Sequence, residues 1–266
     1  MGEFFEHGVL TRKGDARMKL SVCVDALYMG KNIKEAIDDV LEQGIKTIEF
    51  WGWEDKNIEE LVEYQKEKNF EVATFCTKFI SLVDSSCHEA YIEGLIETIE
   101  VAKQLNCKCL ITQTGAAMEG DRKVQYEALV AGLKKCVPYL EENDMTLVVE
   151  PLNIRVDHAG YFLSSSDEAA CIMKEVASEH VKMLFDVYHQ QITEGDLCRR
   201  IDEYQSLIGH YHAAGNPGRH ELFNSEIDYQ KVFDTIKQTG YTGYVGLEYF
   251  PEKEPAEGLQ FCKKVI

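Results

Sequence analysis

The sequence predicts a single-domain α/β protein that folds as a (β/α)8 TIM barrel. Eight short apolar segments alternate with amphipathic segments from residue 19 onward. This alternation is typical of a parallel sheet whose strands are connected by helices. The chain has 266 residues, which is within the usual size of one barrel domain.

The expected strands are short apolar runs bounded by polar or turn-forming residues. They cover residues 19–26, 47–53, 71–77, 108–114, 146–151, 181–187, 208–214 and 244–250. The main competing fold is an open doubly wound sheet, which usually carries a glycine-rich phosphate loop after its first strand. Here the first strand leads into Val24-Asp-Ala-Leu-Tyr-Met-Gly30, and neither G-x-G-x-x-G nor G-x-x-x-x-G-K-S/T occurs. The barrel is therefore favoured over the open sheet.

The expected helices lie between these strands and have charged outer faces. In residues 32–44, apolar residues recur at helical spacing, and Gly44 is suited to end the helix. Two further helices are expected over 91–105 and 124–142. A helix over 166–176 has a less definite start, because it lacks a full capping box.

The first 17 residues differ from the rest of the chain. They have no clean periodicity and no apolar segment of signal-peptide length. We expect residues 1–17 to be an N-terminal extension, either disordered or left from a cloning vector or an upstream start. Residues 18–266 are expected to form the barrel.

Composition excludes several classes of partner. The 46 acidic residues outnumber the 28 lysines and arginines, so the net charge is −18. This charge disfavours nucleic-acid backbones and anionic membranes, and no apolar stretch approaches the length of a membrane helix. The nine cysteines have no zinc-finger spacing, and an odd number without a secretory signal favours reduced thiols in the cytoplasm.

The last four expected strands each end in a side chain that commonly binds metal ions. These residues are Glu150, Asp186, His212 and Glu248. Taken singly, each has an ordinary alternative, such as a strand end in water, a helix cap, a core histidine or an ion pair. In a parallel barrel, however, all strands open onto one face, and four unpaired polar groups at buried strand ends would be costly. We therefore expect one shared divalent cation, Mn²⁺ or Mg²⁺, with Co²⁺ also compatible with three carboxylates and an imidazole.

Other polar residues follow the same strands and are candidates for substrate binding. Asn153 follows the strand that ends at Glu150, and His189 lies three residues after Asp186. Arg219 and His220 lie in a turn-rich loop after His212. An arginine can hold a substrate carboxylate by two parallel hydrogen bonds, although a surface salt bridge is an equal alternative for Arg219.

Aromatic residues near the ends of the second and third strands are candidates for the apolar wall of a sugar pocket. They are Trp51, Trp53, Phe75 and Phe79. Core packing is the more common role for such side chains. Of these four residues, Trp53 is expected to contact the substrate.

Seven segments of the chain closely resemble the hydroxypyruvate isomerase family, which belongs to the xylose-isomerase-like barrels together with the ketose 3-epimerases and endonuclease IV-type enzymes. The resemblance extends over about residues 18–257 and is densest from Glu150 onward. The matching segments are Val149-Glu-Pro-Leu-Asn153, Gly160-Tyr-Phe-Leu163, Phe185-Asp-Val-Tyr-His189, Glu194-Gly-Asp196, Pro217-Gly-Arg-His-Glu221, Glu226-Ile-Asp-Tyr229 and Gly246-Leu-Glu-Tyr249.

The resemblance implies roles for these residues. Glu150, Asp186, His212 and Glu248 correspond to the metal ligands of the family, and Glu150 and Glu248 also correspond to its paired acid/base residues. His189 and Arg219 correspond to positions that contact substrate. The implied activity is the interconversion of hydroxypyruvate and tartronate semialdehyde through a metal-stabilised enediolate.

One departure leaves the substrate open. Hydroxypyruvate isomerases often have glutamine at the position of His212, whereas ketose 3-epimerases have histidine there. The alternative is therefore a 3-epimerase acting on a free sugar of the tagatose, psicose or ribulose type. The acidic substrate ligand of the epimerases also has no clear equivalent here, and Asp157 is the nearest candidate.

The expected partner is thus a small hydroxy-carbonyl compound or sugar, with no nucleic acid and no membrane. Endonuclease IV-like DNA repair is disfavoured, because such sites need more ligands for a metal cluster and because the charge of −18 repels phosphate. A non-catalytic barrel that keeps the metal site remains an alternative. The size is compatible with a homo-oligomer, but no sequence feature marks an interface.

Overall fold

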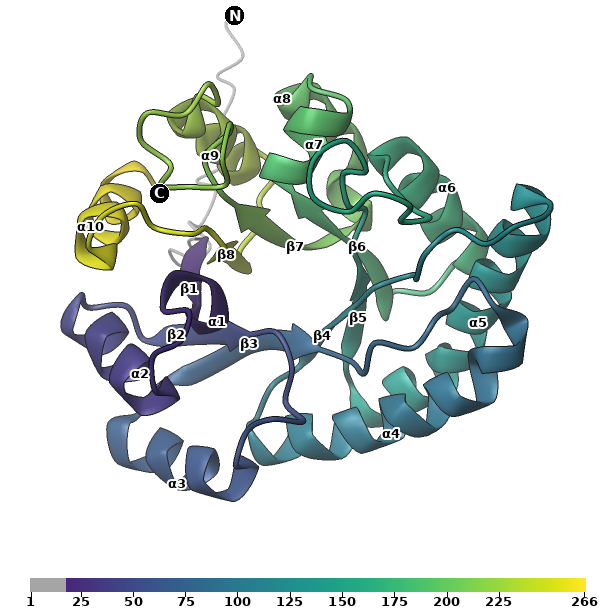
Figure 1. Ribbon diagram of the computed structural model, residues 1–266, viewed down its shortest axis with the longest axis horizontal. Coiled ribbons are helices and arrows are strands. Elements are labelled where there is room, and N and C mark those ends of the chain that lie inside the picture. Colours follow the sequence, from purple (N-terminus) through teal and green to yellow (C-terminus); the bar gives the residue numbers. More distant parts are fainter. Residues whose placement is uncertain (1–17) are drawn as a thin grey trace, which may run out of the picture.

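The computed structural model describes residues 18–266, and they form the predicted barrel. The expected extension over residues 1–17 lies outside the described residues. Eight parallel strands close in chain order, and Figure 1 shows the helices arranged around them. The strands are β1 (Lys19–Cys23), β2 (Thr47–Phe50), β3 (Glu71–Cys76), β4 (Cys109–Thr112), β5 (Thr146–Val149), β6 (Val181–Asp186), β7 (Ile208–Ala213) and β8 (Tyr244–Leu247).

The helices follow the strands in the expected alternation. They are α1 (Val24–Leu27), α2 (Ile33–Glu42), α3 (Ile58–Lys68), η1 (Ser85–Cys87), α4 (His88–Gln104), α5 (Arg122–Asn143), α6 (Ser166–Val176), α7 (Val187–Thr193), α8 (Leu197–Tyr204), η2 (Gln205–Leu207), α9 (Tyr229–Gln238) and α10 (Pro255–Val265). The apolar face of α2 buries Ala36, Ile37 and Val40 toward the strands. Burial of such faces is the main contribution that holds these helices to the barrel.

The ends of the elements differ from the sequence-based prediction in an informative way. Residues 24–26, expected to extend the first strand, form the short helix α1 instead, and β2 ends at Phe50 rather than at residue 53. Helix α6 begins where predicted, because the side chain of Ser165 accepts a hydrogen bond from the backbone N–H of Glu168. The strands are thus shorter than their apolar runs, and the remaining residues of the runs belong to loops or to the starts of helices such as α1 and α7.

The interior of the barrel is chemically divided. Cys76, Ile111, Val148 and Leu184, from β3 to β6, form an apolar cluster inside it. Polar side chains from β1, β2 and β7 fill the other part. Among them are Ser21, Glu49 and His210, all of which are buried. The polar part lies directly against His212 of β7, so it is in contact with the predicted metal ligands.

Two chain-wide features agree with the composition. None of the nine cysteines forms a disulfide, and all nine lie within the described residues. Among the helices of residues 18–266, none combines the length and the apolar character needed to cross a membrane.

Candidate active site

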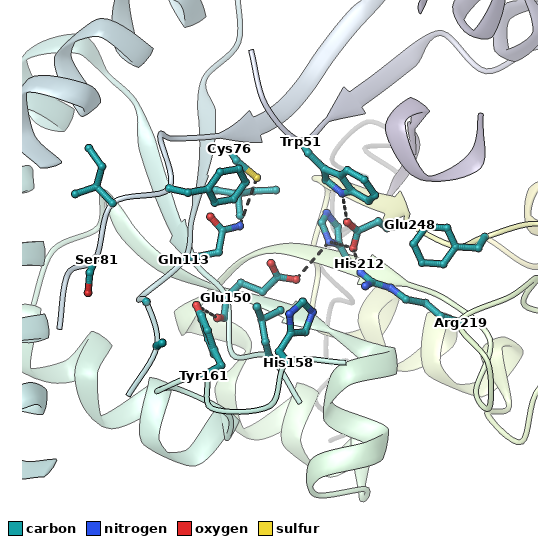
Figure 2. Close-up of a pocket in the computed structure, with 17 residues that line it drawn as sticks. Trp51, Cys76, Ser81, Gln113, Glu150, His158, Tyr161, His212, Arg219 and Glu248 are labelled. Atoms are coloured by element: carbon teal, nitrogen blue, oxygen red, sulfur yellow. Dashed lines mark hydrogen bonds and ion pairs between the residues drawn. The ribbon is translucent and has the colours of Figure 1, made fainter. Parts of the chain in front are cut away.

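The structure brings Glu150, Asp186, His212 and Glu248 together at the carboxyl ends of β5 to β8. One ligand atom from each lies within 4.8 Å of the corresponding atoms of the others, and all four residues are buried. Figure 2 shows Glu150 and Glu248 on either side of His212 in the pocket above the strands. The sequence-based prediction that these four residues converge is therefore met by the geometry.

The strand register places these residues at one level of the barrel. Asp186 of β6 is the register partner of His212 of β7, and His212 is the partner of Gly246 of β8. Asp186 also caps α7, because its Oδ1 accepts the backbone N–H groups of Tyr188 at 2.7 Å and His189 at 3.1 Å. The cap fixes the carboxylate through Oδ1, and its second oxygen, Oδ2, has no hydrogen-bond partner among the described residues.

The imidazole of His212 lies between the two glutamates. Its Nδ1 is 3.2 Å from Glu248 Oε2 and 3.7 Å from Glu150 Oε1. Burial alone would lower the pKa of His212, but the surrounding carboxylates of Glu49, Glu248 and Glu150 raise it well above its ordinary value. The site thus has an excess of negative charge that attracts positive charge.

Unpaired buried atoms indicate that a cation fits this site. Within residues 18–266, Glu150 Oε1, Asp186 Oδ2 and His212 Nδ1 are buried and have no hydrogen-bond partner. Each such atom costs about 1–3 kcal/mol when it is left unsatisfied. Their convergence, with Glu248 beside them, offers three carboxylate oxygens and one nitrogen. This donor set suits Mn²⁺, Mg²⁺ or Co²⁺, whereas a structural zinc site is usually rich in sulfur.

Glu248 is the most strongly paired of the four residues. Its Oε2 accepts a hydrogen bond from Arg219 at 2.5 Å, and its Oε1 accepts one from the indole N–H of Trp51 at 2.5 Å. Burial would raise the pKa of Glu248, but Arg219 and His212 outweigh it and hold the pKa well below its usual value. Glu248 is therefore a carboxylate that stays ionised at neutral pH.

Asp186 has the opposite balance. Burial raises its pKa above the ordinary value and the neighbouring Glu248 adds to the rise, although Arg219 and His212 oppose it. An ionised Asp186 is therefore costly in this environment, and a bound cation would offset that cost.

Arg219 reaches the site from the loop between β7 and α9. Its side chain is 11% exposed, and its guanidinium carbon lies 5.6 Å from the ring centres of both Tyr188 and Phe250. Its backbone has a φ of +59°, a conformation that is uncommon for residues other than glycine. Its Nε is buried and has no hydrogen-bond partner among the described residues, so this N–H donor is unused.

His189 and Asn153 form a second ordered pair beside Asp186. The amide of Asn153 is oriented by its Oδ1, which accepts the backbone N–H groups of Val156 and Asp157. Its Nδ2 lies 2.6 Å from His189 Nδ1, so Nδ1 accepts and the proton of the neutral ring is on Nε2. Burial is the main reason that the pKa of His189 falls to about 3. His189 Nε2, 3.6 Å from Asp186 Oδ2, is therefore a neutral donor next to the ligand cluster.

The ligand cluster lies at a cavity of about 590 Å³, although Asp186 and His189 are not among the residues that line it. Glu150, His212, Arg219 and Glu248 line one part of it, whereas an apolar wall includes the exposed ring of Phe79 and the buried Ile111. Figure 2 shows Gln113, Ser81, Tyr161 and His158 on the side away from Arg219. The cavity thus joins the polar ligand cluster to a wall that contains both apolar and polar side chains.

Several residues predicted to contact substrate lie outside the cavity lining. Trp53 donates its indole N–H to Thr98 of α4 at 3.2 Å, and Trp51 is the tryptophan that lines the cavity. Phe75 stacks on Phe50 in the core, with ring centres 5.0 Å apart. The ring of His220 approaches the carbonyl oxygen of Phe250 at 2.8 Å, so its contact is with the loop after β8.

Asn153 and Asp157 also do not line the cavity. Asn153 is fully buried, and it acts through His189. Asp157, the candidate acidic substrate ligand, accepts hydrogen bonds from Asn153 at 2.6 Å and from the hydroxyl of Tyr188 at 3.0 Å. Both residues therefore orient neighbouring groups.

Sequence reasoning missed two charged or titratable residues of the site, Glu49 and His210. With His212 they form a second buried cluster of potential ligand atoms. The signal for Glu49 was present, because it is a carboxylate within the apolar strand segment Thr47-Ile-Glu-Phe50. The signal for His210 was its position two residues before His212, which places both side chains on the same face of β7.

The chain belongs to the xylose isomerase-like TIM barrel family, whose model matches residues 37–265. It is 34% identical over 169 residues to a putative hydroxypyruvate isomerase of Drosophila melanogaster, a match that covers 63% of this chain and 64% of that protein. It is also 40% identical over 122 residues to the 2-oxo-tetronate isomerase of Cupriavidus necator, over 46% of each chain. These matches span less than two thirds of the length of either relative. The resemblance to hydroxypyruvate isomerases seen in the motifs is confirmed.

The fold is shared with solved structures over nearly the whole chain. A crystal structure described as an AP endonuclease of family 2 from Brucella melitensis matches with a TM-score of 0.89 and 25% identity. The match covers 93% of this chain and 98% of that one. This similarity supports the barrel and the family.

Proposed function

We propose that this protein is a divalent-metal-dependent isomerase that interconverts hydroxypyruvate and tartronate semialdehyde. The observation that carries the proposal is the convergence of Glu150, Asp186, His212 and Glu248 on one point beside a buried arginine. The curated relatives named as hydroxypyruvate and 2-oxo-tetronate isomerases support the same class of reaction. A divalent cation held by the four residues would polarise the substrate carbonyl and offset the negative charge that develops in an enediolate.

The two glutamates are suited to move protons on opposite sides of a substrate. Glu248 remains ionised because of Arg219 and His212, so its carboxylate is available to accept a proton from C3 of hydroxypyruvate. Glu150, across His212 in Figure 2, is the candidate that delivers a proton to C2. The hydroxyl proton moves from O3 to O2, and the reaction needs no oxidant or reductant.

His189 and Arg219 would orient the substrate. The neutral His189 offers an N–H donor beside Asp186, which suits a hydroxyl or carbonyl oxygen of the substrate. Within residues 18–266, the Nε–H of Arg219 has no acceptor, next to the contact of Arg219 with Glu248. We infer that Arg219 holds the substrate carboxylate, because it is the one arginine among the described residues that line this cavity.

A direct experiment is NMR of the purified protein with hydroxypyruvate in D2O, with Mn²⁺, Mg²⁺ or Co²⁺ supplied in turn. We expect tartronate semialdehyde to form with solvent deuterium at C2, because the proton that Glu150 delivers comes from the solvent and not from C3. Mg²⁺ permits direct spectra, and with the paramagnetic ions the samples are treated with chelator first. Metal binding without product or deuterium exchange would overturn the proposed reaction.

A ketose 3-epimerase is the second candidate function. Two observations favour it: the histidine at position 212, and a cavity of about 590 Å³, which exceeds the volume of a three-carbon acid. Product analysis with tagatose, fructose, psicose and ribulose under the same conditions distinguishes the two. Faster turnover of a neutral ketose than of hydroxypyruvate would favour the epimerase.

A further inference from the structure

Glu49 is a buried carboxylate beneath the proposed metal site that the reaction described above does not use. It comes from β2, which is separated from β7, the strand of His212, by β8 and β1. Glu49 is 2% exposed. Its carboxylate lies within contact distance of both histidines of β7. A buried charge of this kind is costly unless its partners stabilise it.

The two oxygens of Glu49 have different partners. Oε2 accepts hydrogen bonds from His210 Nε2 at 3.0 Å and from the hydroxyl of Ser21 at 3.2 Å. Oε1 lies 3.3 Å from His212 Nε2. Both Oε1 and His212 Nε2 are buried, and neither has a hydrogen-bond partner in the described part of the chain, so each is left facing the other. Ser21 and His210 therefore hold the carboxylate in an orientation that directs Oε1 at His212.

Gly246 provides an independent sign that this contact is built into the barrel. Gly246 is the register partner of Ser21 on one side and of His212 on the other. A Cβ at this position would lie 1.8 Å from Glu49 Oε1 and 2.7 Å from His212 Cδ2. Any side chain here would therefore displace the carboxylate or the imidazole, so the glycine keeps open the space in which the two meet.

The contact bears on which nitrogen of His212 carries the proton when the ring is neutral. A neutral imidazole that donates Nε2–H to a carboxylate presents an unprotonated Nδ1. Nδ1 of His212 is the atom next to Glu248 and Glu150. A cation can bind only to an unprotonated ring nitrogen.

We propose that Glu49 is a positioning residue of the metal site, which accepts the Nε2–H of His212 and so keeps Nδ1 unprotonated and aimed at the cation. This role rests on the metal site of the proposed function, and it does not depend on the substrate. Ser21 and His210 orient Glu49, and Gly246 makes room for it.

The test is calorimetric titration of metal-depleted protein with Mn²⁺, comparing wild type with Glu49→Gln. The carboxamide keeps the shape of the side chain but has one acceptor. Ser21 and His210 both donate to the position of Oε2. The carboxamide oxygen therefore takes that position, and the NH2 group of the carboxamide faces His212 Nε2. That arrangement favours a proton on Nδ1. We expect Mn²⁺ affinity to fall roughly 10–100-fold, the usual effect of losing such an outer partner.

The effect must pass through His212, and a double-mutant cycle tests this. His212→Gln replaces the imidazole by an amide, which has no alternative ring nitrogen to protonate. In that background, Glu49→Gln should change Mn²⁺ affinity less than about threefold. Glu59→Gln is the matched control, since it makes the same chemical change at an exposed position of α3 that does not belong to the cluster, and we expect wild-type affinity within about threefold.

Three results would overturn the proposal. One is an unchanged Mn²⁺ affinity in Glu49→Gln. Another is a Glu49→Gln loss of Mn²⁺ affinity that is equally large in wild type and in the His212→Gln background, which would indicate a general charge effect. A wild-type protein that binds no Mn²⁺ would overturn the metal site of the proposed function together with this role. If Glu49→Gln does not fold, ¹⁵N-histidine NMR of Zn²⁺-loaded wild type tests the same point. His212, identified by its absence in His212→Gln, must show a proton on Nε2, and a proton on Nδ1 would overturn the proposal.

Discussion

Replacing Glu248 by glutamine should affect both catalysis and stability, whereas the same change at Glu150 should affect mainly catalysis. The two glutamates have different surroundings. Glu248 is paired with Arg219 and Trp51, each at 2.5 Å. Glu150 Oε1 has no hydrogen-bond partner among residues 18–266, and its nearest ionic neighbour is His212 at 3.7 Å.

The size of the difference follows from burial. The side chains of Glu248 and Arg219 are only 7% and 11% exposed. Removing one partner of a buried ion pair costs about 3–5 kcal/mol, because Arg219 then loses its nearest carboxylate. For a domain of this size, the loss corresponds to a decrease in Tm on the order of 10 °C. Glu150→Gln removes a charge from a crowded acidic site, so we expect its Tm to change by less than about 3 °C.

Both variants should lose turnover, since a positioned acid or base contributes about 10²–10⁴-fold. The assays are thermal denaturation in the presence of chelator, and initial rates with hydroxypyruvate and Mn²⁺. Glu252→Gln, at an exposed position after β8, is the control for a generic loss of charge. A Glu248→Gln protein that keeps about half of the wild-type rate would refute its catalytic role. Equal Tm values for the two variants would refute the inferred difference in pairing.

Three further predictions concern substrate binding, metal and pH. In steady-state kinetics, Arg219→Ala should raise KM for hydroxypyruvate at least tenfold more than KM for a neutral ketose, because only the acid needs a cationic partner. Equal effects on the two KM values would argue against carboxylate binding by Arg219. Saturating chelated protein with Mn²⁺ at about 100 times Kd should stabilise it by about 2.7 kcal/mol in thermal unfolding, and an unchanged Tm would contradict the site. His189 has a pKa of about 3 in the folded protein against an ordinary 6.5. The unfolded chain therefore takes up this proton at a higher pH than the folded protein does, and the free energy of unfolding falls as the pH drops below about 6.5. His189→Asn should remove up to about 1.4 kcal/mol of that loss per pH unit, as measured by urea unfolding from pH 7 to pH 4.

The fold was predictable because barrel strands carry a strong local signal. Each of the eight apolar runs contains one observed strand, and the helix over 166–176 has the predicted bounds. Strand ends were less predictable, because pairing with the neighbouring strands decides where a strand stops. Residues 24–26 continue an apolar run, yet they form α1.

The ligand cluster was predictable for a related reason. Buried strand ends with carboxylates or imidazoles are rare without a partner, so four in succession on a parallel barrel indicated one site. Trp51 and Trp53 could not be separated from the sequence, because they lie two residues apart in a loop after β2 whose path depends on tertiary contacts. The structure places Trp51 against Glu248 and Trp53 against Thr98.

Glu49 was not predicted as a residue of the site from the sequence. A carboxylate in the middle of an apolar strand carries the same signal as one at its end, but it points into the barrel at a deeper level. Its partners Ser21 and His210 lie 28 and 161 residues away in the sequence. Such contacts follow from barrel closure, which no local pattern reports.

The binding of one divalent cation by Glu150, Asp186, His212 and Glu248 is tested most directly by anomalous diffraction from crystals of the protein soaked with Mn²⁺. We predict a single strong peak between these four residues, in contact with His212 Nδ1 and with one oxygen of each carboxylate. The absence of a peak there, or a peak bound by other residues while this site stays empty, would contradict the proposed metal centre and the chemistry built on it.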